Sequence, residues 1–310
     1  MNTQSNAMSE QFPAQSAATS PLSPTRPLYW SIRRELWENR AVYVAPLAVA
    51  AVFLFGFLIS LARLPHQMRA LSSLDPEQQR QSIAIPYDIA DGLMMLTGIL
   101  VSVFYCLDAL HGERRDRSIL FWKSLPVSDL TIVLSKASIP FMILPLLTFV
   151  IAVALQGIIL LMSSAVLLGS GQSAAALWTQ ISFLQMSLLL LYHLLTAHTL
   201  WPAPVYCWLL LVSGWARRAP FLWAALPVVA VGGVEMIAFR TSHFATLVGS
   251  RLIGATPAVA SMPPNSFPTD TMTHIAPGQF LTTPGLWIGL AVGAAFLAAA
   301  VRLRRYRGPI

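Results

Sequence analysis

Residues 137–161 read ASIPFMILPLLTFVIAVALQGIILL, and they open a run that reaches Ala216 without one Asp, Glu, Lys or Arg. A helix that crosses the hydrocarbon layer of a membrane, about 30 Å thick, needs about 20 consecutive apolar residues. The whole chain is 55% hydrophobic and 11% charged, whereas an ordinary soluble domain carries about 25% charged residues. The composition therefore indicates a polytopic membrane protein.

The apolar segments predict an all-α fold with six transmembrane helices. Charged, Gly-rich or Pro-rich sequence separates these segments. The predicted spans are 41–62, 87–108, 137–161, 176–215, 221–239 and 285–301. With their connections they form one transmembrane domain, residues 26–310, and the polar residues 1–25 before it have the composition of a disordered tail.

The fourth span is too long for one straight crossing. Residues 174–215 would form a helix of about 63 Å, twice the thickness of the hydrocarbon layer, and Pro202 and Pro204 interrupt it. One crossing places fifteen of the 20 Lys and Arg residues on the side of both termini, whereas two crossings divide them eleven to nine. Because basic residues concentrate on the cytoplasmic side, we expect one crossing broken at 202–204, with both termini in the cytoplasm.

An amphipathic helix is predicted just before the first span, over residues 28–40. Its aromatic and basic side chains, Trp30, Arg33, Arg34 and Trp37, interleave at helical spacing. This pattern is typical of a helix that lies in the cytoplasmic interface of the membrane. An ordinary solvated helix is the alternative.

The connection between the second and third spans, residues 109–136, is the most informative segment of the chain. A charged run is followed by a short apolar patch, then by Pro126, which stops a helix, and by Ser128, which can cap the next one. An exposed apolar patch beside fixed charges suggests a docking element for a partner protein. The residues of this predicted docking element are Glu113, Arg114, Arg115, Asp116, Arg117, Ile119, Leu120, Phe121, Trp122 and Lys123. A segment that simply lies on the membrane surface is the alternative.

Residues 112–129, GERRDRSILFWKSLPVSD, followed by Leu134-Ser135-Lys136, resemble the cytoplasmic loop of bacterial type-2 ABC exporter permeases. Two further segments resemble the same family, YCWLLLVSGWARRAP at 206–220 and PGLW at 284–287. The resemblance covers nearly the whole chain after residue 25, and it is weakest in the predicted external segment, residues 240–283.

The resemblance implies a role for each part of the chain. The helix before the first span would be the connecting helix, and residues 113–124 would be the coupling helix that sits on a separate ATPase subunit. Two ATPase subunits and a second permease copy or a paralogue would complete an exporter in the bacterial cytoplasmic (inner) membrane. ATP would be bound by the partner subunit, so this chain would need no cofactor of its own.

The residues alone predict no catalytic centre. The chain has no Gly-x-x-x-x-Gly-Lys-Ser/Thr phosphate loop, no His-Glu-x-x-His and no Gly-x-Ser-x-Gly. The net charge of +7 does not indicate nucleic acid binding, since the basic residues fall in short clusters between apolar segments. A membrane anchor that docks a cytosolic partner without transport is the alternative function. A secondary transporter is disfavoured, because no internal repeat is apparent.

Three carboxylates lie within apolar segments. Glu235 is a possible intramembrane polar site, since buried acids in membranes are candidates for function. A structural role, with Arg240 or interfacial water as its partner, is the alternative that we favour. Asp88 and Asp91 could attract a cation, but we interpret them as negative charges that complement a helix N-terminus.

Overall fold

The computed structural model describes residues 25–71, 73–124, 127–180, 182–254 and 277–306. Within these ranges the chain forms helices and turns only. Six helices are long and apolar enough to cross a membrane, which confirms an all-α protein of the multi-pass membrane type. The predicted tail lies outside the described residues, except for Thr25.

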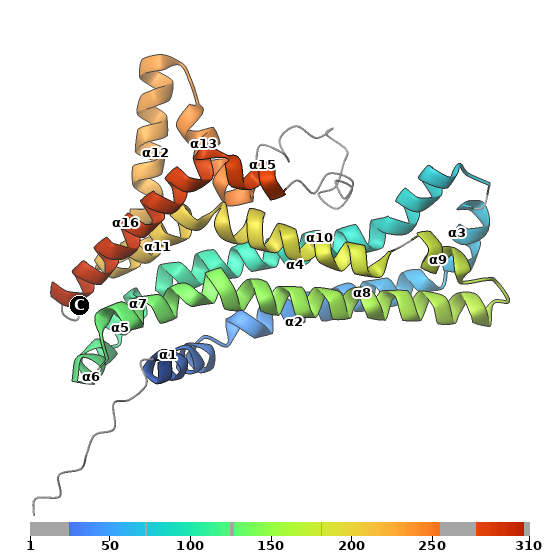
Figure 1. Cartoon of the computed structure of the whole chain (residues 1–310), viewed down its shortest axis with the longest axis horizontal. Helices are drawn as coiled ribbons and strands as arrows, with labels where there is room; N and C mark the ends of the chain where they lie inside the picture. The colour runs from blue at the N-terminus through green and yellow to red at the C-terminus, as the bar shows by residue number, and fades with distance from the viewer. Residues whose placement is uncertain (1–24, 72, 125–126, 181, 255–276, 307–310) are drawn as a thin grey trace, which may run out of the picture.

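The long helices lie side by side along the long axis of the molecule (Figure 1). The segments that build this bundle are α2 (Ala41–Leu61), α4 (Pro76–Asp108), α7 (Asp129–Ser138), η1 (Ile139–Ile143), α8 (Leu144–Gly169), α10 (Phe183–Leu195), η2 (Thr196–Leu200) and α11 (Ala203–Trp215). Helices α7, η1 and α8 form one continuous helical rod. Ser128 starts this rod as predicted, because its hydroxyl accepts a hydrogen bond from the backbone N–H of Thr131 at 3.1 Å.

Short helices close the two ends of the bundle. One end, which we call the basic end, carries α1 (Thr25–Glu38), α5 (His111–Arg115), α6 (Ser118–Ser124) and the last turn of α16 (Pro284–Tyr306). The other, which we call the distal end, carries α3 (Leu64–Leu71) and α9 (Ala175–Gln180). The first and last described residues therefore lie at the same end of the molecule.

The fourth span follows the bundle once, from α9 to the basic end (Figure 1). It is interrupted where η2 gives way to α11. The backbone N–H of Trp201 reaches back five residues to the Thr196 carbonyl at 2.9 Å, and Pro202, which has no N–H, then ends the hydrogen-bond ladder. The helix begins again at Ala203, where a proline in the first turn is tolerated.

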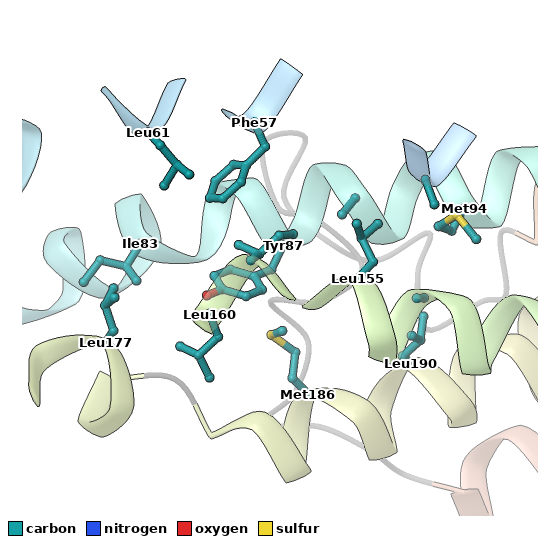
Figure 2. Close-up of a cluster of buried hydrophobic side chains, with 14 of the residues drawn as sticks. Phe57, Leu61, Ile83, Tyr87, Met94, Leu155, Leu160, Leu177, Met186 and Leu190 are labelled. Atoms are coloured by element: carbon teal, nitrogen blue, oxygen red, sulfur yellow. The ribbon is translucent and has the colours of Figure 1, made fainter. Parts of the chain in front are cut away.

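Apolar side chains fill the distal half of the bundle. Phe57 and Leu61 of α2, Tyr87 and Met94 of α4, and Leu155 of α8 are buried together, with side chains of α9 and α10 below them (Figure 2). A second buried cluster, built around Cys106 of α4 and Tyr206 of α11, fills the half nearer the basic end. The two clusters leave the polar groups of the basic end outside the apolar core.

The C-terminal third is arranged differently from the bundle. Helix α12 (Pro220–Phe239) stands away from it in Figure 1, and Ala224 is its one buried residue. Helix α16 instead lies along α11. A Cβ atom on Gly293 of α16 would lie 3.3 Å from the Cys207 sulfur and 3.6 Å from the Cα atom of Pro204, so a glycine allows the two helices to approach closely.

One arginine joins the described part of the predicted external segment to two other parts of the chain. Arg251, on α13 (His243–Ile253), donates to the Trp201 carbonyl at 3.0 Å and to the Gly285 carbonyl, and its guanidinium lies 3.9 Å from the centre of the Trp201 ring. Burial lowers the pKa of Arg251, but an arginine stays charged from so high a starting value. Arg251 therefore ties α13 to the break in the fourth span and to the start of α16. Helix α15 (Pro277–Thr282) precedes α16, and residues 255–276 lie outside the described residues.

Asp88 and Asp91 do not lie at a helix N-terminus, so that interpretation is wrong. Helix α4 begins at Pro76, about three turns before Asp88. Asp91 is buried, and the amide nitrogen of Gln156 on α8 donates to both of its oxygens at 2.9 and 2.8 Å. This bond is a polar tie between α4 and α8 inside the apolar core.

Candidate functional site

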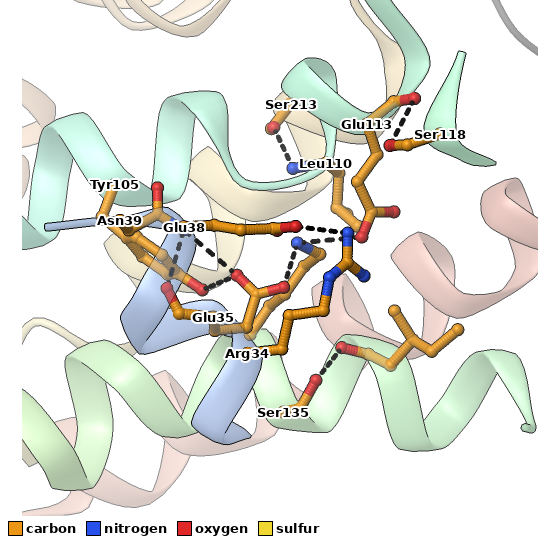
Figure 3. Close-up of polar contacts among 12 residues, drawn as sticks. Arg34, Glu35, Glu38, Asn39, Tyr105, Leu110, Glu113, Ser118, Ser135 and Ser213 are labelled. Carbon is orange, nitrogen blue, oxygen red and sulfur yellow. Dashed lines mark hydrogen bonds and ion pairs between the residues drawn. The ribbon is translucent and has the colours of Figure 1, made fainter. Parts of the chain in front are cut away.

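Lys136 is the centre of a buried ion-pair network at the basic end. Its ammonium group lies 2.7 Å from a carboxylate oxygen of Glu35 and 3.1 Å from one of Glu113. The second Glu35 oxygen accepts a hydrogen bond from the Tyr105 hydroxyl at 2.9 Å. Glu35, Tyr105 and Glu113 come together in Figure 3, although they belong to α1, α4 and α5.

Arg304 of α16 extends the network to the C-terminal end of the described chain. One of its terminal nitrogens pairs with the second oxygen of Glu113, and its Nε atom lies 3.3 Å from a carboxylate oxygen of Asp129. Asp129 is the first residue of α7, where a negative charge also complements the helix dipole. Glu113 therefore joins two cations that come from different helices.

Burial makes this network sensitive to the loss of any member. The side chains of Glu35, Glu113, Lys136 and Arg304 are each at most 6% exposed, whereas Asp129 is 29% exposed. Removing one partner of a buried pair leaves an uncompensated charge, which costs about 3–5 kcal/mol. The ion pairs thus fix α1, α5, α7 and α16 relative to one another.

A second set of bonds attaches the start of the loop to α11. The hydroxyl of Ser213 accepts from the backbone N–H groups of Leu110 and His111 at 2.9 and 2.8 Å. Arg114 donates to the carbonyls of Gly214 and Ala216 at 2.7 and 3.2 Å. A cation at the C-terminal carbonyls of a helix is favourable. Helix α5 is therefore bonded to the end of the fourth span.

The structure divides eight of the ten residues of the predicted docking element into two groups. Glu113, Arg114 and Ile119 are buried and make their contacts inside the chain. The exposed residues are Arg115, Asp116, Arg117, Leu120 and Lys123. The side chains of Phe121 and Trp122 lie outside the described part, although the α6 backbone that carries them is described.

The backbone turns sharply between α5 and α6. Arg117 has a φ of 59°, in the left-handed region, which is unfavourable for a residue with a Cβ atom. This residue separates α5, which carries the buried Glu113 and Arg114, from α6, which carries the exposed Leu120 and Lys123 beside the buried Ile119. The loop thus has an anchored inner part, residues 111–114, and an outer part, residues 115–124, in which most of the described side chains are exposed.

Helix α1 presents its aromatic residues to the outside. Trp30 and Trp37 are 59% and 70% exposed, and the guanidinium of Arg33 lies 5.3 and 5.2 Å from the centres of their rings. Arg34 is partly exposed and pairs with Glu38 one turn later. Glu35 points the other way, into the buried network.

Glu235 has a structural partner that differs from the two expected ones. Its carboxylate accepts hydrogen bonds from the hydroxyl of Thr241 at 2.9 Å and from the backbone N–H groups of His243 and Phe244, both at 2.8 Å. Those N–H groups open α13 and would otherwise lack acceptors. Glu235 caps α13, which favours the structural interpretation of this residue.

Sequence reasoning did not find Glu35, Lys136 and Arg304 as a group. One signal was present: Lys136 and Arg304 each adjoin a long apolar run, where a charged side chain has to find a partner or reach water. Their common partner, Glu113, is predicted from the sequence as part of the exposed docking element, because it belongs to a charged run beside an apolar patch. Sequence spacing does not show which charge in such a run turns inward.

Comparisons with protein-family models, with curated proteins and with solved structures found no match to this chain. Among the described residues, no three or more His, Cys, Asp or Glu side chains are grouped in a way that could hold a metal ion.

Proposed function

We propose that this protein is the membrane-spanning permease subunit of an ATP-driven exporter, and that a separate ATPase subunit docks on α6. The observation that carries the proposal is the division of the loop. Its inner part is bonded directly to three other helices, α7, α11 and α16, and its outer part exposes Arg115, Asp116, Leu120 and Lys123. The resemblance of residues 112–129 to the coupling loop of type-2 ABC exporters supports the same assignment.

The bonds of the inner part give a physical route for transmitting force. A push on α6 moves α5 through the short connection at Arg117. Helix α5 is tied to α1 and α7 through Lys136, to α16 through Arg304 and to α11 through Arg114. The helices that meet at the basic end would therefore move together when the ATPase closes on ATP.

The proposal includes an orientation and an assembly. The basic end faces the cytoplasm of a bacterium, because the positive-inside rule places most Lys and Arg residues there. Two ATPase subunits drive two permease subunits, the second being another copy of this chain or a paralogue. This chain binds no ATP itself, which agrees with its lack of a phosphate loop.

Co-purification tests the docking. The full chain is expressed with its natural gene neighbours and purified in mild detergent, and bound ATPase is measured by mass spectrometry and ATP hydrolysis. Phe121→Ala with Trp122→Ala should reduce the bound ATPase at least tenfold, because aromatic residues contribute most at docking surfaces. The control, Trp30→Ala with Trp37→Ala, removes two aromatic residues from α1 at the same end and should leave the bound ATPase unchanged.

Two results would contradict the proposal. If both double variants retain the ATPase equally, α6 is not its docking site. If a partner without ATPase activity is lost from the α6 variant alone, the chain is a membrane anchor that docks a cytosolic protein, and the transport assignment fails.

A further inference from the structure

A groove opens between α11 and α16 near the basic end. It has a volume of about 720 Å³, which is within the usual range of small-molecule sites. Its lining residues are Trp208, Leu211, Val212, Trp215, Ala299, Arg302, Leu303 and Tyr306. The groove is thus an apolar slot with two tryptophans, one tyrosine and one arginine.

Three contacts with other residues fix the tryptophans of the groove. The indole N–H of Trp208 donates to the Ala224 carbonyl of α12 at 3.3 Å, and its ring lies 5.4 Å from that of Phe296. The ring of Trp215 lies 4.9 Å from that of Trp223, edge to face. Residues of α12 and α16 therefore hold both tryptophans in place.

The charge at the groove is positive. Arg302 is exposed and lines the groove, whereas Arg304, two residues later, faces the opposite way and pairs with Glu113. Arg217 and Arg218 are exposed and follow Trp215 in the chain after one alanine. Of the eight lining residues, Arg302 is the one that carries a charge.

We propose that this groove binds one anionic phospholipid from the leaflet at the basic end. Its acyl chains lie against Trp208, Leu211 and Leu303, and its phosphate lies at Arg302. Trp and Tyr side chains favour the level of the lipid headgroups, and basic pockets between transmembrane helices favour anionic headgroups. A free phosphate ion is disfavoured as the occupant, because it would make no apolar contact with the side chains that line most of the groove.

The test uses the purified full chain in nanodiscs that contain equal amounts of phosphatidylglycerol and phosphatidylcholine. After transfer to mild detergent, the lipids that stay bound are counted by native mass spectrometry. The wild-type protein should retain phosphatidylglycerol in preference to phosphatidylcholine. Arg302→Gln should lower the retained phosphatidylglycerol about fivefold, as expected for loss of one basic contact near a membrane surface.

Two further variants complete the design. Arg305→Gln removes the same charge from the same turn of α16, but Arg305 does not line the groove, so retention should stay at the wild-type level. Leu303→Trp keeps Arg302 but fills the groove, and it should reduce retention of phosphatidylglycerol. Excess inorganic phosphate at constant ionic strength should not displace the lipid.

Lipid retention tests the proposed lipid site without a transport assay. Equal retention by the wild type and Arg302→Gln overturns it, and so does an equal loss in Arg302→Gln and Arg305→Gln. Displacement by inorganic phosphate would also overturn it, because the groove would then hold a free anion. Each variant is first checked for an unchanged melting temperature, and Leu303→Trp tests the groove without altering any charge.

Discussion

Lys136 lies between two carboxylates, Glu35 and Glu113, and its side chain is 3% exposed. At this depth the cost of removing charges from water is offset only by close and well-oriented partners. An exposed pair such as Arg34 with Glu38 gains much less, because water screens it. The two kinds of ion pair at the same end of the molecule can therefore be compared directly.

We expect Lys136→Met to destabilise the protein by about 3–5 kcal/mol, because Glu35 and Glu113 would keep their charges without their shared partner. Arg34→Met, the control, should cost less than about 1 kcal/mol. The melting temperature of the purified protein in detergent measures both effects. Adding Glu35→Gln to Lys136→Met should recover part of the loss, since one uncompensated charge disappears. Equal shifts for Lys136→Met and Arg34→Met would show that the network contributes no more than a surface pair.

Among the elements, the pairing of α11 with α16 depends on a glycine. Gly293 lies against Cys207 and the backbone of Pro204, so a side chain there fits only if these neighbours shift. Gly56, in the second half of α2, has nothing within 4 Å of its added Cβ atom and is exposed. Both glycines lie in apolar helices, but only one of them is needed for a close approach.

Gly293→Leu should therefore separate α11 from α16 and destabilise the protein by at least about 1–3 kcal/mol, the usual cost of an overpacked contact. Gly56→Leu should be neutral or slightly stabilising, because leucine forms helices better than glycine by nearly 1 kcal/mol. The melting temperatures of the two variants measure the difference. A melting temperature for Gly293→Leu at or above that of Gly56→Leu would rule out the close crossing of these helices.

For the whole molecule, the arrangement of its ends determines how it sits in a membrane. Both described chain ends and the α5–α6 loop lie at the basic end, and the turn between α3 and α4 lies at the distal end. The two native cysteines, Cys106 and Cys207, are buried. We therefore expect a thiol reagent to label introduced cysteines and not the native ones, so that the labelling reports the orientation of the protein.

We expect a membrane-impermeant maleimide to label Ser73→Cys in intact cells, because Ser73 is exposed at the distal end. Asp116→Cys, which is exposed at the basic end, should react only after the membrane is permeabilised. The opposite pattern would invert the orientation and with it the proposed docking of the ATPase. Labelling of both positions from outside would show that α4 does not cross the membrane.

The apolar helices could be predicted from the sequence because their cause is local. A long uncharged run forms a helix in lipid, where each backbone N–H and C=O has to be satisfied within the segment. The start of α7 at Ser128 was predictable for a similar reason, since a cap depends on residues three positions apart. The start of α4 at Pro76 was not found, because residues 76–86 are polar enough to look like a loop.

The tertiary structure alone decided which charges of the loop face inward. Glu113 and Arg114 stand beside Arg115 and Asp116 in one charged run, yet the first two are buried and the last two are exposed. Lys136 and Arg304 make the inward position of Glu113 favourable, and Arg304 lies 191 residues further along the chain. Hydrophobicity is a property of each residue, whereas the stability of a buried charge depends on partners that only folding brings within bonding distance.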